Sequence, residues 1–364
     1  MKVLYYFRNL DSLMFKWQVY HIVDEMKHHD CYIDILSPND YKDVDSANQA
    51  LLARIIKGEY NLFMTCLNDK YLYSDTIKEI HKHGIPTLLF CPDNLVAPFN
   101  HKNISSLFDL VWLTSKETEY LFLKWGCKTV FLPYAANPYF LKPSNSKEEY
   151  RRVGFIGNPH GSRIDRINYL LKNRIPITIH TSSGNLDTTF FKADIKDYIQ
   201  LFYNYSKYPI GRKLAIATII DKFFKRNIVD PYNCLEKRNA VPLEELSKIN
   251  NKYSLILSFT DANSSGVLAN PVKIVNLRNF EIPMSGGIQF TLYSDELASY
   301  FENDKEIVMG KTMEECVDKA KFYLDDNQYE LRQKIRIAAR IRAEKDHTWF
   351  NRFSMVFKSL GLKI

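Results

Sequence analysis

Short apolar segments alternate with amphipathic segments along most of the chain. In the first 135 residues, six apolar runs rich in aromatic and branched side chains are typical of β-strands: KVLYYF, YIDIL, YNLFMTC, TLLFCP, LVWLTS and TVFLPYA. Stretches with helical periodicity separate them, among them residues 13–29, 73–83 and 116–125. This alternation favours a parallel sheet with helices on both faces, whose ligand-facing edge is formed by the loops that follow the strands.

The alternation stops at residues 136–150 and starts again beyond them. The segment ANPYFLKPSNSKEEY combines two prolines with serines and other polar residues, which is typical of a linker. The strand-like runs RVGFIG, ITIHTS, SLILSF, GIQFT and EIVMG follow it. Helices are predicted between these runs at 163–172, 243–250, 272–279 and over 312–344.

We therefore expect an α/β protein with two Rossmann-like, doubly wound domains that face a cleft. The N-terminal domain should comprise residues 1–140 and the C-terminal domain residues 141–335, with closing helices at 336–364 that pack back toward the N-terminal domain. Between about 184 and 240 the pattern instead predicts a basic, helical insertion. Within it, GRKLAIATIIDKFFKR, Gly211–Arg226, is an amphipathic helix.

The net charge of +7 is partly local. Residues 191–240 contain ten Lys or Arg and five Asp or Glu, an excess of +5. A local basic patch suits an acidic substrate, an anionic membrane or a protein partner, whereas nucleic-acid binding usually needs a longer basic stripe. We expect no nucleic-acid partner. For Gly211–Arg226, packing against its own domain and peripheral contact with the inner membrane face remain alternatives.

The six cysteines are scattered and include no CxxC pair. This spacing indicates free thiols in a reducing compartment and argues against a zinc site. No segment approaches the roughly 18 consecutive apolar residues of a membrane span. The opening MKVLYYFRNLD is too short an apolar run for a signal peptide. We therefore expect a cytoplasmic protein with no metal.

The segment RVGFIGNPHGSRIDRI predicts a strand, a turn and a helix start. Gly157 permits the turn, Asn158 and His160 lie in it, and Ser162 could cap the helix. Arg163 and the first N–H groups of the helix could hold a phosphate. The alternative is a tight turn with a surface arginine, because the GxGxxG spacing of the dinucleotide fingerprint is absent.

The segment NFEIPMSGGIQF places Glu281 in an otherwise uncharged run. A helix is expected to end near Glu281, and Ser285, Gly286 and Gly287 then open onto a strand. The glycine pair would let a ligand approach bare backbone, at a cost of roughly 0.5–1 kcal/mol for each residue in a regular element. Glu281 could accept hydrogen bonds from two vicinal hydroxyls, as acidic residues do for a ribose. A structural ion pair with Arg278 or Lys273 is the alternative.

Other polar positions follow predicted strands. In FCPDNLVAP, Asp93 could orient or deprotonate an acceptor hydroxyl, or could simply form an Asx turn. His347 in HTW and the pair Arg8 and Asn9 leave the same choice between a functional and a structural role. The loop SFTDANSSGVLANP, 258–271, suits sugar or phosphate contacts and is equally compatible with turns.

Four motifs of the second half occur in the order found in one family: VGFIGNPHGSR (153–163), NLRNFEIPMSGG (276–287), ELASYFENDKEIV (296–308) and HTWFNRF (347–353). They resemble the CgeB-type glycosyltransferases, relatives of the group 1 GT-B families, over most of 150–355. In the N-terminal half, FLPYAANPYF resembles the interdomain crossing of these enzymes.

The resemblance implies a GT-B fold in which the C-terminal domain holds a nucleotide-diphosphate sugar and no metal or other cofactor is required. Glu281 matches the acidic residue that holds the donor ribose, and Arg163 is similar in position to the groups that meet the diphosphate. Gly286 and Gly287 match a close-packed turn beside the nucleotide. Lys273 replaces a second glutamate of the group 1 pattern, which leaves retaining and inverting chemistry open.

We expect a metal-independent hexosyltransferase that moves sugar from this donor to a glycan or lipid-linked acceptor in bacterial cell-surface polysaccharide biosynthesis. The acceptor should enter near Arg8, Asn9 and Asp93. One alternative is a nucleotide-sugar epimerase of the same fold, with Asp93 and His347 as acid and base. The other is a non-catalytic assembly protein with a GT-B body, which the lysine at 273 favours.

Overall fold

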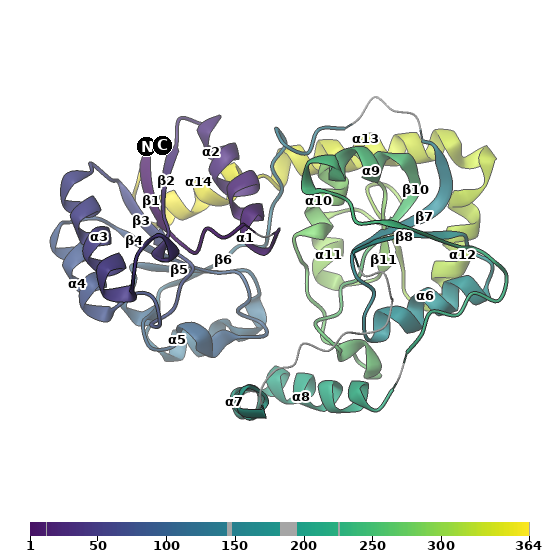
Figure 1. The fold of residues 1–364 in the computed structure, drawn as a ribbon. Helices are drawn as coiled ribbons and strands as arrows, with labels where there is room; N and C mark the ends of the chain where they lie inside the picture. Colours follow the sequence, from purple (N-terminus) through teal and green to yellow (C-terminus); the bar gives the residue numbers. More distant parts are fainter. Residues whose placement is uncertain (12, 144–147, 183–194, 225, 364) are drawn as a thin grey trace. The chain divides into compact units, whose positions relative to one another are not determined.

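The chain folds into two compact units, each built around one six-stranded parallel sheet (Figure 1). A computed structural model describes residues 1–11, 13–143, 148–182, 195–224 and 226–363. The N-terminal unit comprises Met1–Phe140 together with His347–Ile364, and the C-terminal unit comprises Leu141–Asp346. The predicted α/β class with two parallel, helix-covered sheets is confirmed.

The sheet of the N-terminal unit has the strand order β2-β1-β3-β4-β5-β6. The four inner strands, β1, β3, β4 and β5, are almost entirely buried, as expected of a parallel sheet with helices on both faces, whereas the edge strands β2 and β6 are partly exposed. The strands are β1 (Lys2–Tyr6), β2 (Tyr32–Leu36), β3 (Leu62–Thr65), β4 (Thr87–Cys91), β5 (Leu110–Leu113) and β6 (Thr129–Phe131).

Short helices cover this sheet. They are α1 (Leu13–Gln18), α2 (Asp24–Lys27), α3 (Val44–Lys57), α4 (Ser74–Lys82), α5 (Glu119–Lys124) and α14 (Trp349–Ser359), with 3-10 turns at Pro38–Asp40, Pro98–His101, Ser105–Leu107 and Lys116–Thr118.

The single helix predicted over 13–29 is interrupted by a π-helical segment, Val19–Val23. Asn137 explains the interruption, because its Nδ2 donates to the carbonyl of Tyr20 (2.6 Å) and its backbone N–H reaches Nδ1 of His21 (3.2 Å). Such an insertion into the helical hydrogen-bond ladder is a common cause of local rewinding.

The last helix, α14, packs into the N-terminal unit through aromatic side chains. Trp349 is fully buried, and its ring lies 5.8 Å from the ring of Trp112 and 5.8 Å from that of Trp17. The remaining tryptophan, Trp125, belongs to the same unit. Tryptophan fluorescence therefore reports on the N-terminal unit alone.

The sheet of the C-terminal unit has the order β12-β11-β10-β7-β8-β9, again with parallel neighbours. Its strands are β7 (Tyr150–Ile156), β8 (Ile177–Thr181), β9 (Leu235–Asn239), β10 (Tyr253–Leu257), β11 (Gln289–Leu292) and β12 (Val308–Gly310). Its helices are α6 (Ser162–Lys172), α7 (Ile195–Ser206), α8 (Pro209–Lys222), α9 (Leu246–Lys252), α10 (Arg278–Met284), α11 (Asp295–Tyr300), α12 (Met313–Leu324) and α13 (Tyr329–Asp346), with 3-10 turns at Leu243–Glu245, Ser265–Val267 and Asp326–Gln328.

Two sequence-based predictions of secondary structure in this unit differ from the structure. The segment 184–240 was expected to be helical, yet its end forms the edge strand β9, where Leu235 pairs with Ile177. Its sequence LEKRN is polar because an edge strand leaves one side in solvent. The helix predicted at 272–279 begins only at Arg278, because the residues before it form an antiparallel bridge, Lys273 with Asp261.

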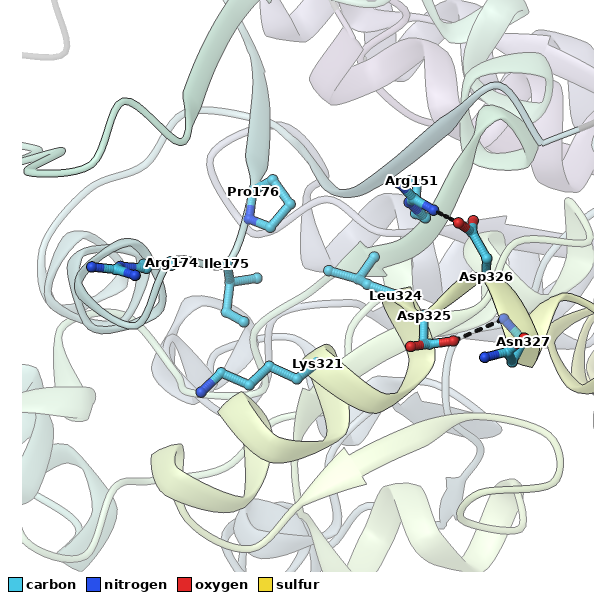
Figure 2. Close-up of a pocket in the computed structure, with 9 residues that line it drawn as sticks. All are labelled: Arg151, Arg174, Ile175, Pro176, Lys321, Leu324, Asp325, Asp326 and Asn327. Carbon is cyan, nitrogen blue, oxygen red and sulfur yellow. Dashed lines mark hydrogen bonds and ion pairs between the residues drawn. The ribbon is translucent and has the colours of Figure 1, made fainter.

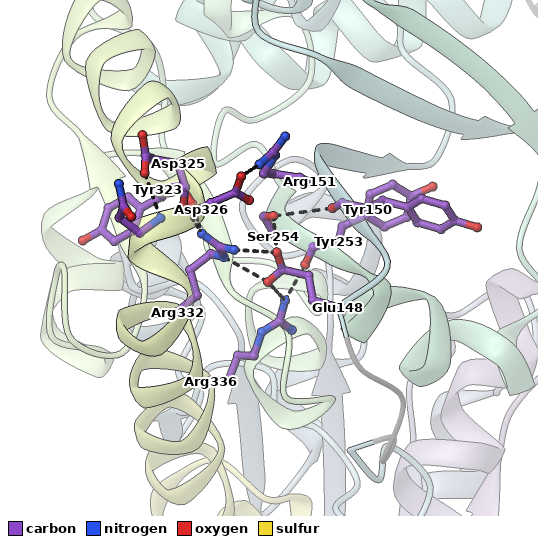
Figure 3. Close-up of polar contacts among 11 residues, drawn as sticks. Glu148, Tyr150, Arg151, Tyr253, Ser254, Tyr323, Asp325, Asp326, Arg332 and Arg336 are labelled. Atoms are coloured by element: carbon purple, nitrogen blue, oxygen red, sulfur yellow. Dashed lines mark hydrogen bonds and ion pairs between the residues drawn. The ribbon is translucent and has the colours of Figure 1, made fainter.

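A buried ion network fixes the long helix α13 to the sheet (Figure 3). The carboxylate of Glu148 accepts hydrogen bonds from Nη2 (2.8 Å) and Nε (3.0 Å) of Arg332, and lies 3.3 Å from Nη2 of Arg336. Ser254 donates a further hydrogen bond to it (2.6 Å). Removing one member of such a network leaves an uncompensated buried charge, which typically costs about 3–5 kcal/mol.

We therefore predict that Glu148→Ala lowers the free energy of unfolding of the C-terminal unit by about 3–5 kcal/mol. Urea denaturation followed by circular dichroism should detect the loss, whereas the tryptophan transition should move much less. Glu344→Ala is a matched control, because its ion pair with Arg340 is half exposed and should contribute about 0–1 kcal/mol. Equal losses of unfolding free energy in Glu148→Ala and Glu344→Ala would contradict a dominant stabilising role for the buried network around Glu148.

A second buried carboxyl belongs to Glu25 on α2 and contacts the first turn of α14. It accepts a hydrogen bond from the N–H of Phe350 (2.7 Å), but burial raises its pKa to about 8. An ordinary glutamate in the unfolded chain titrates near 4.5. The folded state therefore holds a proton that the unfolded state releases between these values, so stability should fall as pH rises from about 4.5 to 8.

We predict that the tryptophan-monitored free energy of unfolding decreases by on the order of 4 kcal/mol across this pH range. Glu25→Gln mimics the protonated carboxyl and should flatten the decrease. A variant that keeps the full pH dependence would exclude Glu25 as its source.

Candidate functional site

The C-terminal ends of β7 and β10 and the start of α10 meet at one edge of the second sheet. Asn276, just before α10, donates through Nδ2 to the carbonyl of Phe259 (3.1 Å), which follows β10. Within α10, Nδ2 of Asn279 lies 3.4 Å from Oγ of Ser258. Most of the residues predicted to hold a nucleotide thus reach the edge at which parallel α/β sheets bind ligands.

The turn after β7 depends on two glycines. Gly157 has φ of +140° and Gly161 has φ of +55°, a conformation that other residues rarely adopt. A Cβ on Gly161 would also lie 3.1 Å from Oδ2 of Asp221, on α8. Gly161 occupies the N-cap position, so the prediction that Ser162 caps α6 was wrong: Ser162 is the first helical residue.

Arg163 and Arg166 lie on the same face of α6, and both guanidinium groups lie over the ring of Phe259, at 5.8 and 5.9 Å. Burial lowers the pKa of Arg163, and the nearby cations Arg166 and Arg278 lower it further. The negative charge of Asp261 raises it and so opposes these effects. Three positive side chains are therefore close enough to interact. Within the described residues, no carboxylate lies within ion-pairing distance of Arg163.

Asp261 is the buried anion of this edge. Its side chain is only 4% exposed and forms ion pairs with Arg166 and with Nζ of Lys273 (2.8 Å). The backbone bridge between Asp261 and Lys273 folds the loop 258–271 back on itself. The lysine that replaces the second glutamate of the group 1 pattern is thus ion-paired rather than free.

Glu281 lies in the first turn of α10, not at a helix end. It is buried and ion-paired with Arg278, with Nε to Oε2 at 3.4 Å. This pair is the structural alternative that the sequence left open. Nη1 of Arg278 is also buried and has no hydrogen-bond acceptor among the described residues, so it retains a donor for an anion.

Asn158 and His160 lie in the turn before α6. Oδ1 of Asn158 accepts hydrogen bonds from Thr181 (2.5 Å) and Ser182 (3.4 Å), which joins the ends of β7 and β8. Although part of His160 reaches solvent, desolvation of its ring and the charge of Arg163 lower its pKa to about 4. At neutral pH this imidazole is uncharged.

The structure separates Ser285, Gly286 and Gly287 from the rest of the predicted site. They connect the C-terminal end of α10 to the start of β11, at the opposite end of the sheet. A Cβ on Gly286 would meet Pro143 at 3.1 Å, and one on Gly287 would meet Asn250 at 3.2 Å. The bare backbone here allows protein packing, so the expectation that it faces a nucleotide was wrong.

Arg8, Asn9 and Asp93 lie at one edge of the N-terminal sheet, because they follow the parallel strands β1 and β4. Arg8 donates to Oδ1 of Asn39 (3.1 Å), and its guanidinium lies 5.2 Å from the ring of Tyr71. Asp93 keeps more than a third of its surface in solvent, yet the packed atoms around its carboxyl raise its pKa by desolvation.

His347 has a structural environment. It is buried, its Nδ1 lies 3.0 Å from Nη2 of Arg352, and its carbonyl accepts from the N–H of Ala136 (3.0 Å). Arg352 also donates to the carbonyl of Pro133 (3.0 Å). This cluster secures the return of the chain into the N-terminal unit, which disfavours the predicted catalytic role.

Four residues of the site were not predicted individually: Arg166, Phe259, Asp261 and Asp221. Phe259 and Asp261 nevertheless lie in the loop 258–271, which was expected to suit sugar or phosphate contacts. Two signals were available. Arg166 follows Arg163 by three positions and therefore shares its helix face. Asp261 comes shortly after the strand SLILSF, where polar residues reach the ligand edge.

A hollow of about 670 Å³ lies at the opposite end of the C-terminal sheet, lined by Arg151 at the start of β7, by the residues before β8 and by the end of α12 with the turn that follows it (Figure 2). Its polar groups largely satisfy one another: Arg151 is paired with Asp326, and Asp325 accepts from the N–H of Asn327 (2.8 Å). We therefore place the candidate site at the Arg163 edge.

Across the described parts of the chain, no cluster of three or more His, Cys, Asp or Glu side chains could hold a metal ion. In the same residues, none of the helices combines the length and the apolar character needed to cross a membrane.

We predict that Asp261→Asn destabilises the C-terminal unit by about 3 kcal/mol or more, because Arg166 and Lys273 lose their shared anion. Circular dichroism during urea denaturation measures this loss. The double variant Asp261→Asn with Arg166→Gln should be more stable than the sum of the single losses, since the uncompensated cation is gone. If the stability losses of the two single variants simply add in the double variant, a direct ion pair between Asp261 and Arg166 is contradicted.

Comparisons with known proteins agree with the observed fold. Residues 221–357 match the family model described as "Glycosyl transferase-like". A search of curated protein sequences finds no significant match. Because the family model begins at residue 221, the comparison of residues 1–220 with known proteins rests on structural similarity.

Three solved structures illustrate the similarity. A glycosyltransferase from Rickettsia africae has a TM-score of 0.58 at 10% identity, covering 99% of this chain and 98% of the other. Sucrose-phosphate synthase from Thermosynechococcus elongatus has a TM-score of 0.55 at 11% identity. Anabaena HepE, solved in complex with UDP-glucose, has a TM-score of 0.55 at 12% identity. The last two comparisons cover 99% of both chains. The chain therefore has the fold of the GT-B glycosyltransferases, and its residues 221–357 carry the glycosyl transferase-like pattern.

Proposed function

We propose that the protein is a glycosyltransferase that binds a nucleotide-diphosphate sugar at the C-terminal edge of its second sheet. The observation that carries the proposal is the group of three arginines, Arg163, Arg166 and Arg278, around the turn after β7. Asp261 neutralises one of them and Glu281 another, so the edge keeps a positive excess. A diphosphate is the natural counterion for such an edge.

The diphosphate would be bound by Arg163, by the buried Nη1 donor of Arg278 and by the first N–H groups of α6. A helix N-terminus favours anions through its unpaired donors and its dipole. As the sugar leaves, negative charge grows on the diphosphate, and these fixed cations would stabilise it without a metal ion. Neutral His160 would contribute a hydrogen bond rather than a charge.

Glu281 would accept hydrogen bonds from the two ribose hydroxyls. Its ion pair with Arg278 orients the carboxylate and offsets part of the cost of its burial. The same pair would bind two adjacent parts of the donor, since Arg278 would contact the diphosphate and Glu281 the ribose.

The acceptor hydroxyl would bind at the edge of the N-terminal sheet near Arg8, Asn9 and Asp93. Its oxygen would form the new bond to the anomeric carbon of the sugar, while the bond from that carbon to the diphosphate breaks and the electron pair leaves with the phosphate. The Asp93 carboxylate would take the hydroxyl proton. Its raised pKa makes it a better base than an exposed aspartate.

The similar HepE structures contain UDP, UDP-glucose, or UDP with glucose, which supports UDP-hexoses as the first donors to test. We propose a glycan or lipid-linked acceptor in bacterial cell-surface polysaccharide synthesis, with the enzyme in the cytoplasm. The N-terminal unit would bind the acceptor and the C-terminal unit the donor, as the sequence predicted. The predicted start of the closing helices at 336 falls inside α13, which belongs to the C-terminal unit, so only the chain from His347 onward returns to the N-terminal unit.

We predict that Arg163→Ala and Glu281→Ala each weaken nucleotide binding at least tenfold while the chain stays folded. The experiment is a thermal-shift titration with UDP, GDP, CDP and ADP, in which a ligand at 100 times its Kd stabilises by about 2.7 kcal/mol. Arg151→Ala is a matched control, because it removes an arginine from the opposite end of the same sheet and should bind normally.

Unchanged binding by both site variants would refute the donor site. Binding of no nucleotide by the wild-type chain would favour the non-catalytic assembly protein. Conversion of the donor to its epimer, without any acceptor present, would favour the epimerase. Sugar transfer to an added glycan or lipid-linked acceptor is the result that supports the proposal.

A further inference from the structure

Helix α8 exposes an apolar stripe that the donor site does not use. Ile216, Ile219 and Phe223 recur at helical spacing along one face, with exposures of 53%, 47% and 82%. Phe224 beside them is also largely exposed. In Figure 1 this helix lies outside the layers of the C-terminal unit, so the stripe is not part of the packing around the sheet.

The opposite face of α8 accounts for its attachment to the unit. Leu214 and Ala217 are buried there. Asp221 accepts a hydrogen bond from Ser264 (2.8 Å) and pairs with Arg226 (2.5 Å), which ties the end of the helix to the loop after β10. Packing against its own domain, one of the two alternatives for this helix, therefore uses this face alone and leaves the stripe exposed.

The surroundings of the stripe are strongly basic. Residues 199–226 contain six Lys or Arg and a single acidic residue, Asp221. Asp221 is already neutralised by its ion pair with Arg226, whereas Arg212 and Lys213 are exposed one turn before the stripe. An apolar stripe flanked by cations matches the boundary between anionic headgroups and acyl chains in a lipid bilayer.

The neighbouring helix α7 extends the same type of surface. Ile199 and Tyr203 are 64% and 60% exposed, and Lys207 follows them at the turn into α8. A tyrosine suits the interfacial layer, where its ring is apolar and its hydroxyl remains hydrated.

We propose that the α7–α8 hairpin is a peripheral docking surface for an anionic lipid bilayer. Phe223 and Ile219 insert between the headgroups, while Arg212 and Lys213 contact the lipid phosphates. Charge complementarity favours an anionic bilayer over a second copy of this chain, because two copies would bring together two hairpins that each carry a net charge of +5 over residues 199–226. This inference does not depend on the identity of the donor.

The test is flotation of the full-length protein with vesicles of equal parts phosphatidylglycerol and phosphatidylcholine, at low ionic strength. The protein should bind these vesicles and not those of phosphatidylcholine alone. Phe223→Ser should weaken binding about tenfold, from the loss of a buried aromatic side chain. Arg212→Ala and Lys213→Ala should each weaken it about fivefold, because each basic residue near an anionic surface contributes about 1 kcal/mol.

Ile56→Ser is the matched control, because Ile56 is 63% exposed on α3 in the other unit and should not affect binding. Nucleotide thermal shifts should be unchanged in all these variants, which separates this surface from the donor site. Absent vesicle binding, or equal binding by Phe223→Ser, would overturn the proposal. A dimer in sedimentation that Phe223→Ser dissociates would also overturn it, and would assign the stripe to a second copy.

Discussion

The carboxylate of Asp261 stands between two cations, and this arrangement determines how much positive charge the edge of the second sheet carries. Asp261 is buried, and such an anion persists only with close partners, here Arg166 and Lys273. The ion pairs close the loop after β10 and hold Phe259 beneath two guanidinium groups. Arg163 is left with its charge available, which is the condition that the proposed donor site requires.

The two ends of the same sheet use their charges differently. At the end where the strands begin, Glu148 satisfies Arg332 and Arg336 within the protein, and the glycine turn at 286–287 is closed by packing. At the end where the strands finish, Arg163, Arg166, Lys273 and Arg278 outnumber the two carboxylates that pair with three of them, Asp261 and Glu281. A parallel sheet concentrates strand ends and helix N-termini at that second edge, so the fold itself supplies part of the anion preference. The end at which the buried arginines are paired within the protein and the end proposed to bind the donor therefore lie at opposite ends of the strands.

The sequence predicted the fold well because buried parallel strands leave a plain pattern of short apolar runs between amphipathic helices. It failed at β9, whose polar residues reflect its place at the sheet edge, and at the start of α10, where the bridge from Lys273 to Asp261 delays the helix. The glycine pair was misread for a related reason: close backbone approach has the same signature whether the neighbour is a ligand or the protein's own Asn250. Only the fold shows which neighbour is present.

The most direct test of the account is a crystal structure of the protein soaked with UDP-glucose. The account predicts diphosphate density against Arg163 and Nη1 of Arg278, at the N-terminus of α6, with the ribose hydroxyls on Glu281. Nucleotide density at another place, such as the hollow beside Arg151, with the Arg163 edge unchanged from the free protein, would contradict it.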